Sequence, residues 1–152
     1  MLKAGDLAPN FEVQTSEGSV FKLSDYRGKK VVLYFYPKDD TPGCTTEACD
    51  FRENINLFNQ LNCQVIGISR DSIESHIKFK NKYELNFSLG SDVEGSICKL
   101  YGTWAEKSMF GKKYFGVLRS TFLIDESGII IKVWEKVKVS NHIKEILDIL
   151  NT

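Results

Sequence analysis

The sequence predicts an α/β fold in which helices flank a mixed central sheet. Residues 31–36 and Cys63–Ser69 are continuous apolar runs rich in β-branched and aromatic side chains, which is typical of strands buried on both faces. Each run is followed by a segment with the apolar period of a helix. The 152 residues are expected to form one domain, residues 1–152, which is long enough to bury its own core without a disulfide.

An N-terminal β-hairpin is predicted before the first buried strand. Residues 10–15 alternate apolar with polar side chains, and residues 19–23 repeat the alternation after the turn Ser16-Glu17-Gly18. A period of two is typical of a strand with one buried face. We therefore expect a β-hairpin over this part of the chain.

A helix is predicted after strand 31–36, with its start near Cys44. From Thr45 to about Leu61 apolar side chains recur every three or four residues, which produces one stripe along an amphipathic helix. The stripe consists of Ala48, Phe51, Ile55, Phe58 and Leu61.

The next helix is predicted to open at Asp71, because Asp71 with Glu74 resembles a capping box. We expect this helix to continue to about Leu85. A short strand over residues 87–90 and a short helix over residues 93–101 are predicted to follow.

No element is predicted for residues 103–117, which show no clean period. Beyond them, residues 121–124 and 129–134 flank Asp125-Glu126-Ser127-Gly128, a turn sequence that predicts an antiparallel hairpin. Ser140 is predicted to cap a final helix. The apolar stripe of that helix is Ile143, Ile146, Leu147 and Leu150.

The order of these elements describes a mixed α/β sandwich. Alternating strands and helices are followed by a hairpin and a closing helix, so parallel and antiparallel strands are expected in one sheet. A thioredoxin-like fold fits this order. The chain contains no repeat or linker that would divide it.

Charge and hydropathy exclude several classes of partner. Twenty Lys and Arg residues balance twenty Asp and Glu residues, so no overall field would attract nucleic acid or a membrane surface. The N-terminus lacks the apolar region of a signal peptide, and no run approaches the ~18 apolar residues of a membrane span. We expect a cytosolic protein, in which the four cysteines are catalytic, metal-binding or buried thiols.

Cys44 is a candidate nucleophile because it lies where a strand gives way to a helix. Unpaired amides and the positive end of the helix dipole both stabilise a thiolate over a thiol. Pro37 ends the strand, and Pro42-Gly43 forms a turn that brings the backbone close to the sulfur. The hydroxyl of Thr41 can donate to an oxygen bound at the sulfur.

Cys49 follows Cys44 by five residues, close enough in sequence to trap an oxidised sulfur. In an intact helix five residues place two Cα atoms about 8.6 Å apart. A disulfide tolerates Cα separations only up to about 6.8 Å. We therefore expect the first turns of the helix to unwind when such a bridge forms.

Two other interpretations of the cysteines are less favoured. Cysteines often simply pack in a core, but the proline-rich entry before Cys44 and the second cysteine after it argue against that interpretation here. A zinc site lacks a second close cluster of ligands. His76 and His142 are isolated in the sequence, and each is expected to be a surface residue of a helix.

Taken together, these residues resemble the peroxiredoxins, specifically the bacterioferritin-comigratory or peroxiredoxin Q subfamily. The resemblance covers nearly the whole chain. The motifs that carry it are residues 5–11, 35–49, 67–69, 101–104, 119–125 and 140–142.

The resemblance implies a thiol-dependent peroxidase without a cofactor, in which Cys44 is the peroxidatic cysteine and its thiolate becomes a sulfenic acid. Pro37, Thr41 and Arg119 match the rest of the active site. Arg119 would stabilise the thiolate and donate to one oxygen of the hydroperoxide, Thr41 would donate to the other oxygen, and Pro37 would shield the sulfur from water. Glu47 is a candidate for orienting Arg119.

The resemblance also implies that Cys49 is the resolving cysteine of an intrachain disulfide, with thioredoxin or a similar dithiol as the reductant. Cys63 and Cys98 are expected to be core residues, and the chain is expected to be monomeric. The competing function is that of a peroxide sensor, relay or chaperone that passes oxidation to a partner protein. General disulfide reduction is disfavoured, because four residues rather than two separate Cys44 from Cys49.

Apolar side chains in the unassigned segment are candidates either for lining the substrate pocket or for packing in the ordinary core. These residues are Trp104, Met109, Phe110 and Phe115. Because the preference among hydroperoxides depends on these walls, the sequence leaves that preference open.

Overall fold

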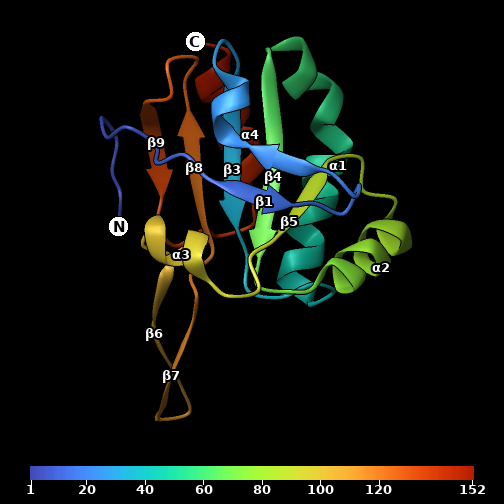
Figure 1. The fold of residues 1–152 in the computed structure, drawn as a ribbon, viewed down its shortest axis with the longest axis vertical. Helices are drawn as coiled ribbons and strands as arrows, with labels where there is room; N and C mark the ends of the chain where they lie inside the picture. Colours follow the sequence, from blue (N-terminus) through green and yellow to red (C-terminus); the bar gives the residue numbers. More distant parts are fainter.

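A five-stranded mixed sheet forms the centre of the computed structural model, which describes residues 1–152 (Figure 1). The central strand β3 runs parallel to β4 and antiparallel to β8, and the strand order is β5-β4-β3-β8-β9. The strands are β3 (Lys30–Phe35), β4 (Cys63–Ser69), β5 (Ser88–Ser91), β8 (Ser120–Ile124) and β9 (Ile130–Trp134). The predicted α/β class with a mixed sheet is confirmed.

Two apolar cores lie on opposite faces of the sheet, because successive side chains of β3 point in opposite directions. Val31, Leu33 and Phe35 pack in one core, and Val32 and Tyr34 pack in the other. The second core is shared with α1 (Pro42–Gln60), α2 (Ile73–Tyr83) and α4 (His142–Leu150). The predicted buried strand and its amphipathic helix are therefore confirmed. No helix is both long enough and apolar enough to span a membrane.

The predicted N-terminal hairpin covers the first core. Strands β1 (Glu12–Gln14) and β2 (Val20–Lys22) pair antiparallel and cross in front of the sheet in the view of Figure 1. Val13 and Phe21 are directly paired and both are buried. A 3₁₀ turn (Leu23–Tyr26) leads from the hairpin towards β3, and the short helix α3 (Ser96–Leu100) packs on the same core.

Residues 103–117, for which no element was predicted, form a second hairpin. Strands β6 (Trp104–Met109) and β7 (Lys112–Val117) pair only with each other and project away from the sheet (Figure 1). Phe110 and Gly111 both adopt positive φ at the tip, and Phe110 is 98% exposed. Because both faces of this hairpin are largely exposed, its sequence carries no alternation of buried and polar side chains.

The predicted capping box at Asp71 is wrong. Ser72 is the N-cap of α2, and its hydroxyl accepts a hydrogen bond from the amide of Ser75. The carboxylate of Asp71 instead accepts from the backbone amide of Asp39, in the loop before α1. A long-range partner thus replaces the local cap. The helix also ends at Tyr83, earlier than predicted, because the next residue is left-handed.

The starts of two other helices differ slightly from the prediction. Ser140 does not cap α4, because Asn141 is the N-cap and has positive φ. Helix α1 begins at Pro42 rather than at Cys44, since proline is well suited to the first position of a helix. Cys44 is therefore the third helical residue.

Candidate active site

Cys44 lies at the amino end of α1 and is only 2% exposed. Thr41 is the N-cap, but its hydroxyl donates to the carbonyl of Lys38 at 2.8 Å and caps no amide of the helix. The amides of Gly43 and Cys44 consequently have no acceptor within the protein. Cys44 therefore lies at a helix start that carries two free amides and the positive end of the helix dipole, an arrangement that favours an anion.

The pairing of β8 with β3 brings Arg119 to this helix start. Ser120 pairs with Phe35, the last residue of β3, so Arg119 lies at the sheet edge where the loop into α1 begins. Its Nη2 donates to Sγ of Cys44 at 3.2 Å, and its Nη1 donates to Oε1 of Glu47 at 2.9 Å. The guanidinium fork thus contacts the thiol and a carboxylate at once.

The charges around Arg119 keep its guanidinium protonated. Burial by itself would lower the pKa of Arg119, but the negative charges of Cys44 and Glu47 outweigh burial and raise the pKa. The site therefore presents a permanent cation to the sulfur.

Glu47 is the fully buried partner of this cation. Burial raises the pKa of Glu47 to about 7, although the adjacent Arg119 opposes the shift. Its Oε2 has no hydrogen-bond partner, which adds to the cost of the ionised form. Glu47, the candidate from the sequence for orienting Arg119, forms an ion pair with it.

Gly43 leaves the space that Arg119 occupies. A Cβ atom on residue 43 would lie 3.0 Å from Nη2 of Arg119. Because such a contact is tighter than normal packing, a larger residue here would push the guanidinium away from Cys44. Glycine is therefore favoured directly before Cys44 because it leaves room for the guanidinium.

The other predicted site residues lie in the loop before α1 or further along the helix. Pro37 is half-buried directly after Tyr36, and the hydroxyl of Thr41 would have to leave Lys38 before it could donate to a bound oxygen. Cys49 is half-buried on α1, and the helix is continuous through both cysteines.

Two cysteines outside the site are buried thiols. Burial raises the pKa of Cys63 and of Cys98 to about 12 in each case, so both remain protonated near neutral pH. The prediction that they are core residues agrees with their burial.

The prediction that His142 is a surface residue is wrong. His142 is 2% exposed, and its Nε2 lies 2.8 Å from the hydroxyl of Thr121 on β8. Burial lowers the pKa of His142 to about 4, so the ring is neutral near pH 7. It supports the strand that follows Arg119.

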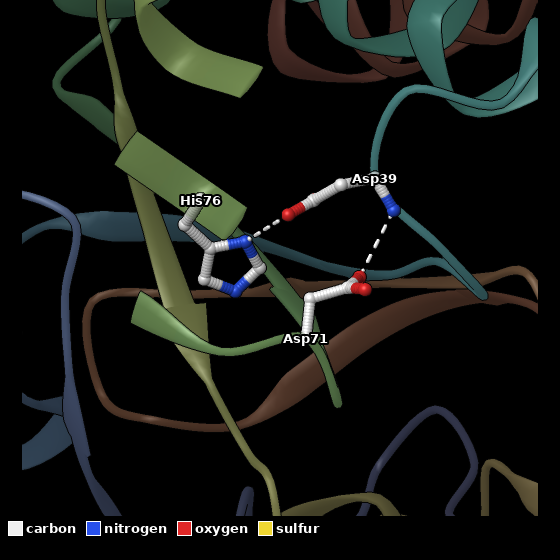
Figure 2. A group of neighbouring side chains, drawn as sticks. All are labelled: Asp39, Asp71 and His76. Carbon is white, nitrogen blue, oxygen red and sulfur yellow. Dashed lines mark hydrogen bonds and ion pairs between the residues drawn. The ribbon is translucent and has the colours of Figure 1, made fainter. Parts of the chain in front are cut away.

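The prediction that His76 is a surface residue is also wrong. His76 is fully buried, and its Nδ1 lies 2.7 Å from Oδ2 of Asp39. Figure 2 shows how the two side chains face each other. Asp71 lies beside the pair, and ligand-type atoms of the three residues are within 4.8 Å of one another. Both ring nitrogens of His76 already face oxygen atoms of the protein. The group is thus a hydrogen-bonded cluster, with no ring nitrogen left for a metal ion.

A sequence signal for this cluster exists at the ends of the strands. Asp39 follows β3 and Asp71 follows β4, and the carboxyl ends of adjacent parallel strands meet at one edge of a sheet. No comparable feature in the sequence around His76 predicts that α2 brings this side chain to the cluster.

Comparison with known proteins identifies the family. A model described as the AhpC/TSA family matches residues 4–133. Peroxiredoxin Bcp of Bacillus subtilis (strain 168) is 51% identical, and the match covers 98% of this chain and 95% of that protein. Peroxiredoxin Bcp of Escherichia coli (strain K12) is 45% identical, with coverage of 93% and 90%.

Solved structures of similar proteins share the fold. A cysteine-to-serine variant of Xylella fastidiosa peroxiredoxin Q has a TM-score of 0.94 and 39% identity, with coverage of 99% and 96% of the two chains. The bacterioferritin comigratory protein of Xanthomonas campestris, described with alkyl peroxide reduction activity, has a TM-score of 0.88 and 38% identity, with coverage of 93% and 90%. The chain therefore belongs to the AhpC/TSA family, and the thioredoxin-like fold and the predicted resemblance are confirmed.

Proposed function

We propose that this member of the AhpC/TSA family, whose relatives are thiol-dependent peroxidases, reduces hydroperoxides through a disulfide formed within one chain. The Cys44 thiolate attacks one peroxide oxygen, the O–O bond breaks, and an alcohol or water leaves after taking a proton. Cys44 is then a sulfenic acid. The thiolate of Cys49 attacks its sulfur, an S–S bond forms, and the hydroxyl leaves as water.

The contact of Arg119 with both Cys44 and Glu47 is the observation that carries this proposal. A fixed cation beside the sulfur stabilises the thiolate before reaction and the charge that develops on the leaving oxygen. We propose that the free amides of Gly43 and Cys44 and the hydroxyl of Thr41 donate hydrogen bonds to the oxygens of the substrate. Pro37 is assigned to the shielding of the sulfur from water.

Resolution by Cys49 requires helix α1 to open. Both cysteines lie in the continuous helix Pro42–Gln60, where the spacing of five residues keeps their Cα atoms too far apart for a bridge. The first turns must therefore unwind before the disulfide forms. The half-buried position of Cys49 supports its assignment, since Cys63 and Cys98 are deeply buried.

The disulfide must be reduced by an external dithiol, for which we propose thioredoxin or a similar protein. We infer that the enzyme works in the cytosol as a monomer, as expected from the sequence. Organic hydroperoxides are included among the substrates, because the related Xanthomonas campestris protein is described with alkyl peroxide reduction activity.

The proposal is tested by peptide-mapped mass spectrometry after one equivalent of hydrogen peroxide. Wild type should contain a bridge between Cys44 and Cys49, and Cys49→Ser should contain a Cys44 sulfenic acid. Cys63→Ser is the matched control and should behave as wild type. If Cys44 stays reduced, the peroxidase proposal fails, and if it pairs with Cys98, the choice of resolving cysteine is wrong.

Turnover with thioredoxin separates the peroxidase from the redox relay. A peroxidase consumes many equivalents of hydrogen peroxide per chain when thioredoxin, its reductase and NADPH are supplied. A relay would stop after one equivalent and accumulate a mixed disulfide with its partner.

A further inference from the structure

The loop that joins β3 to α1 is held against α2 by side chains from both elements. Asp39 lies at the centre of this loop, and its side chain is only 4% exposed. Its backbone amide donates to Asp71 at 2.9 Å, so the loop is tied to the end of β4 as well. The same loop carries Pro37 and Thr41, which the proposed function places around the substrate.

The carboxylate of Asp39 is fully engaged by three donors. Tyr36 donates its hydroxyl to Oδ1 at 2.6 Å, and Ser75 donates its hydroxyl to Oδ2 at 2.8 Å. Nδ1 of His76 lies 2.7 Å from Oδ2, and this contact is the dashed line between His76 and Asp39 in Figure 2. Two of these donors come from the first turn of α2, so the carboxylate joins the loop to that helix.

His76 extends the connection to the sheet. Its Nε2 lies 3.0 Å from the carbonyl oxygen of Gly90 on β5, and a carbonyl can only accept. The ring is thus held between the carboxylate of Asp39 on one side and the carbonyl of Gly90 on the other. A buried pair whose hydrogen bonds are all made holds its members in one arrangement.

Asp40, the next residue, also makes side-chain hydrogen bonds to α2, but these hydrogen bonds are exposed to solvent. Its carboxylate accepts from Lys82 and Tyr83 at 2.8 and 2.6 Å, and the side chains of Asp40 and Lys82 are 41% and 58% exposed. Exposed contacts of this kind hold a loop only weakly. Asp40 therefore offers a matched comparison for the buried contacts of Asp39.

We propose that Asp39 and His76 form a positioning pair that keeps Pro37 and Thr41 in place for the reaction at Cys44. The proposal rests on the proposed function. Helix α1 must unwind between Cys44 and Cys49 in each cycle, and the loop directly before it would be carried along unless something outside α1 held it. Asp39 and His76 provide that anchor, because α2 and β5 take no part in the unwinding.

The test compares Asp39→Asn and His76→Gln with Asp40→Asn as the matched control. Two rates are measured on reduced protein at a temperature where circular dichroism shows each variant folded. The first is the rate of Cys44 oxidation by hydrogen peroxide, and the second is the rate of Cys44 alkylation by iodoacetamide. Alkylation needs the thiolate but none of the groups that bind the oxygens of a peroxide, so it reports the thiolate alone.

We expect the two variants at the buried pair to lose about tenfold or more in the peroxide rate, while alkylation changes by less than about threefold. Asp40→Asn should retain both wild-type rates. Equal losses in both rates, faster alkylation of all four cysteines, or unfolding of both variants would assign the pair to stability alone and overturn the proposal. A peroxide rate equal to that of Asp40→Asn would overturn it too. Failure of wild type to oxidise at Cys44 would instead sink the proposed function.

Discussion

Glu47 and Arg119 form an ion pair next to the sulfur of Cys44, with Oε1 of Glu47 2.9 Å from Nη1 of Arg119. The glutamate side chain is completely buried, and the other arm of the guanidinium reaches Sγ at 3.2 Å. One planar fork therefore links the thiol to a carboxylate whose pKa is about 7. The protonation state of Glu47 and the reactivity of Cys44 are coupled through Arg119.

Replacement of Arg119 by lysine should slow the reaction of Cys44 with hydrogen peroxide by about 100-fold. An ammonium group is a point charge on a flexible stem and cannot contact Cys44 and Glu47 together. The rate is measured by competition with a peroxidase of known rate. Arg27→Lys is the control, since Arg27 donates only to the exposed carbonyl of Ser127. Equal losses in the two variants would contradict a specific role for Arg119.

Glu47→Gln should lower the peroxide rate at pH 8 by about tenfold, because a neutral amide orients the guanidinium less strongly than a carboxylate. Glu53→Gln provides the control, as the side chain of Glu53 lies on the exposed face of the same helix. The same competition assay measures both variants. An unchanged rate in Glu47→Gln would show that Arg119 needs no support from this carboxylate.

The stability of the protein should depend on pH through Glu47. Its pKa rises from an ordinary 4.5 to about 7 on folding, so the folded state binds the extra proton between these values. The contribution of Glu47 to the free energy of unfolding therefore falls by about 3 kcal/mol as pH rises from about 4.5 to about 7. It changes little above that range.

This pH dependence is measured from urea unfolding of wild type and Glu47→Gln at pH 5 and pH 7.5. The difference in unfolding free energy between the two proteins isolates Glu47, because both proteins contain His142 and its opposite pH dependence cancels in the difference. His142 has a lowered pKa, so its contribution is lost as pH falls. A constant difference between the two proteins across this range would contradict the burial-driven shift of Glu47.

Formation of the disulfide should open the first turns of α1. Amides of residues 47–51 are expected to lose hydrogen-exchange protection in the oxidised protein, since their helical hydrogen bonds must break before Cys44 and Cys49 can meet. Mass spectrometry of reduced and oxidised protein provides the measurement. Cys49→Ser treated with the same peroxide is the control and should keep its protection. Equal protection in both states of the wild type would rule out unwinding.

Local elements with a strong pattern were predictable from the sequence. The apolar run of β3, the stripe of α1 and the alternation of the N-terminal hairpin each reflect contacts with a buried face. Cys44 was identifiable for the same reason, because its environment at a helix start depends on its immediate neighbours in the chain.

Helix starts and isolated polar residues were less predictable. Asp71 has the sequence of a cap, but the amide of Asp39 competes for it across the sheet edge. His76 and His142 look like surface residues because their partners, Asp39 and Thr121, lie 37 and 21 residues away. No window of neighbouring residues contains that information.

The sequence by itself determined the α/β class, the strand before the active site and the position of Cys44 at the start of a helix. These features follow from periodicity and turn chemistry, which act over a few residues. Only the tertiary structure decided that Arg119 reaches the sulfur, that Asp39 and His76 pair in the interior, and that residues 103–117 project as a hairpin. Each of these depends on which strands pair and which groups lose water, and both are properties of the folded chain as a whole.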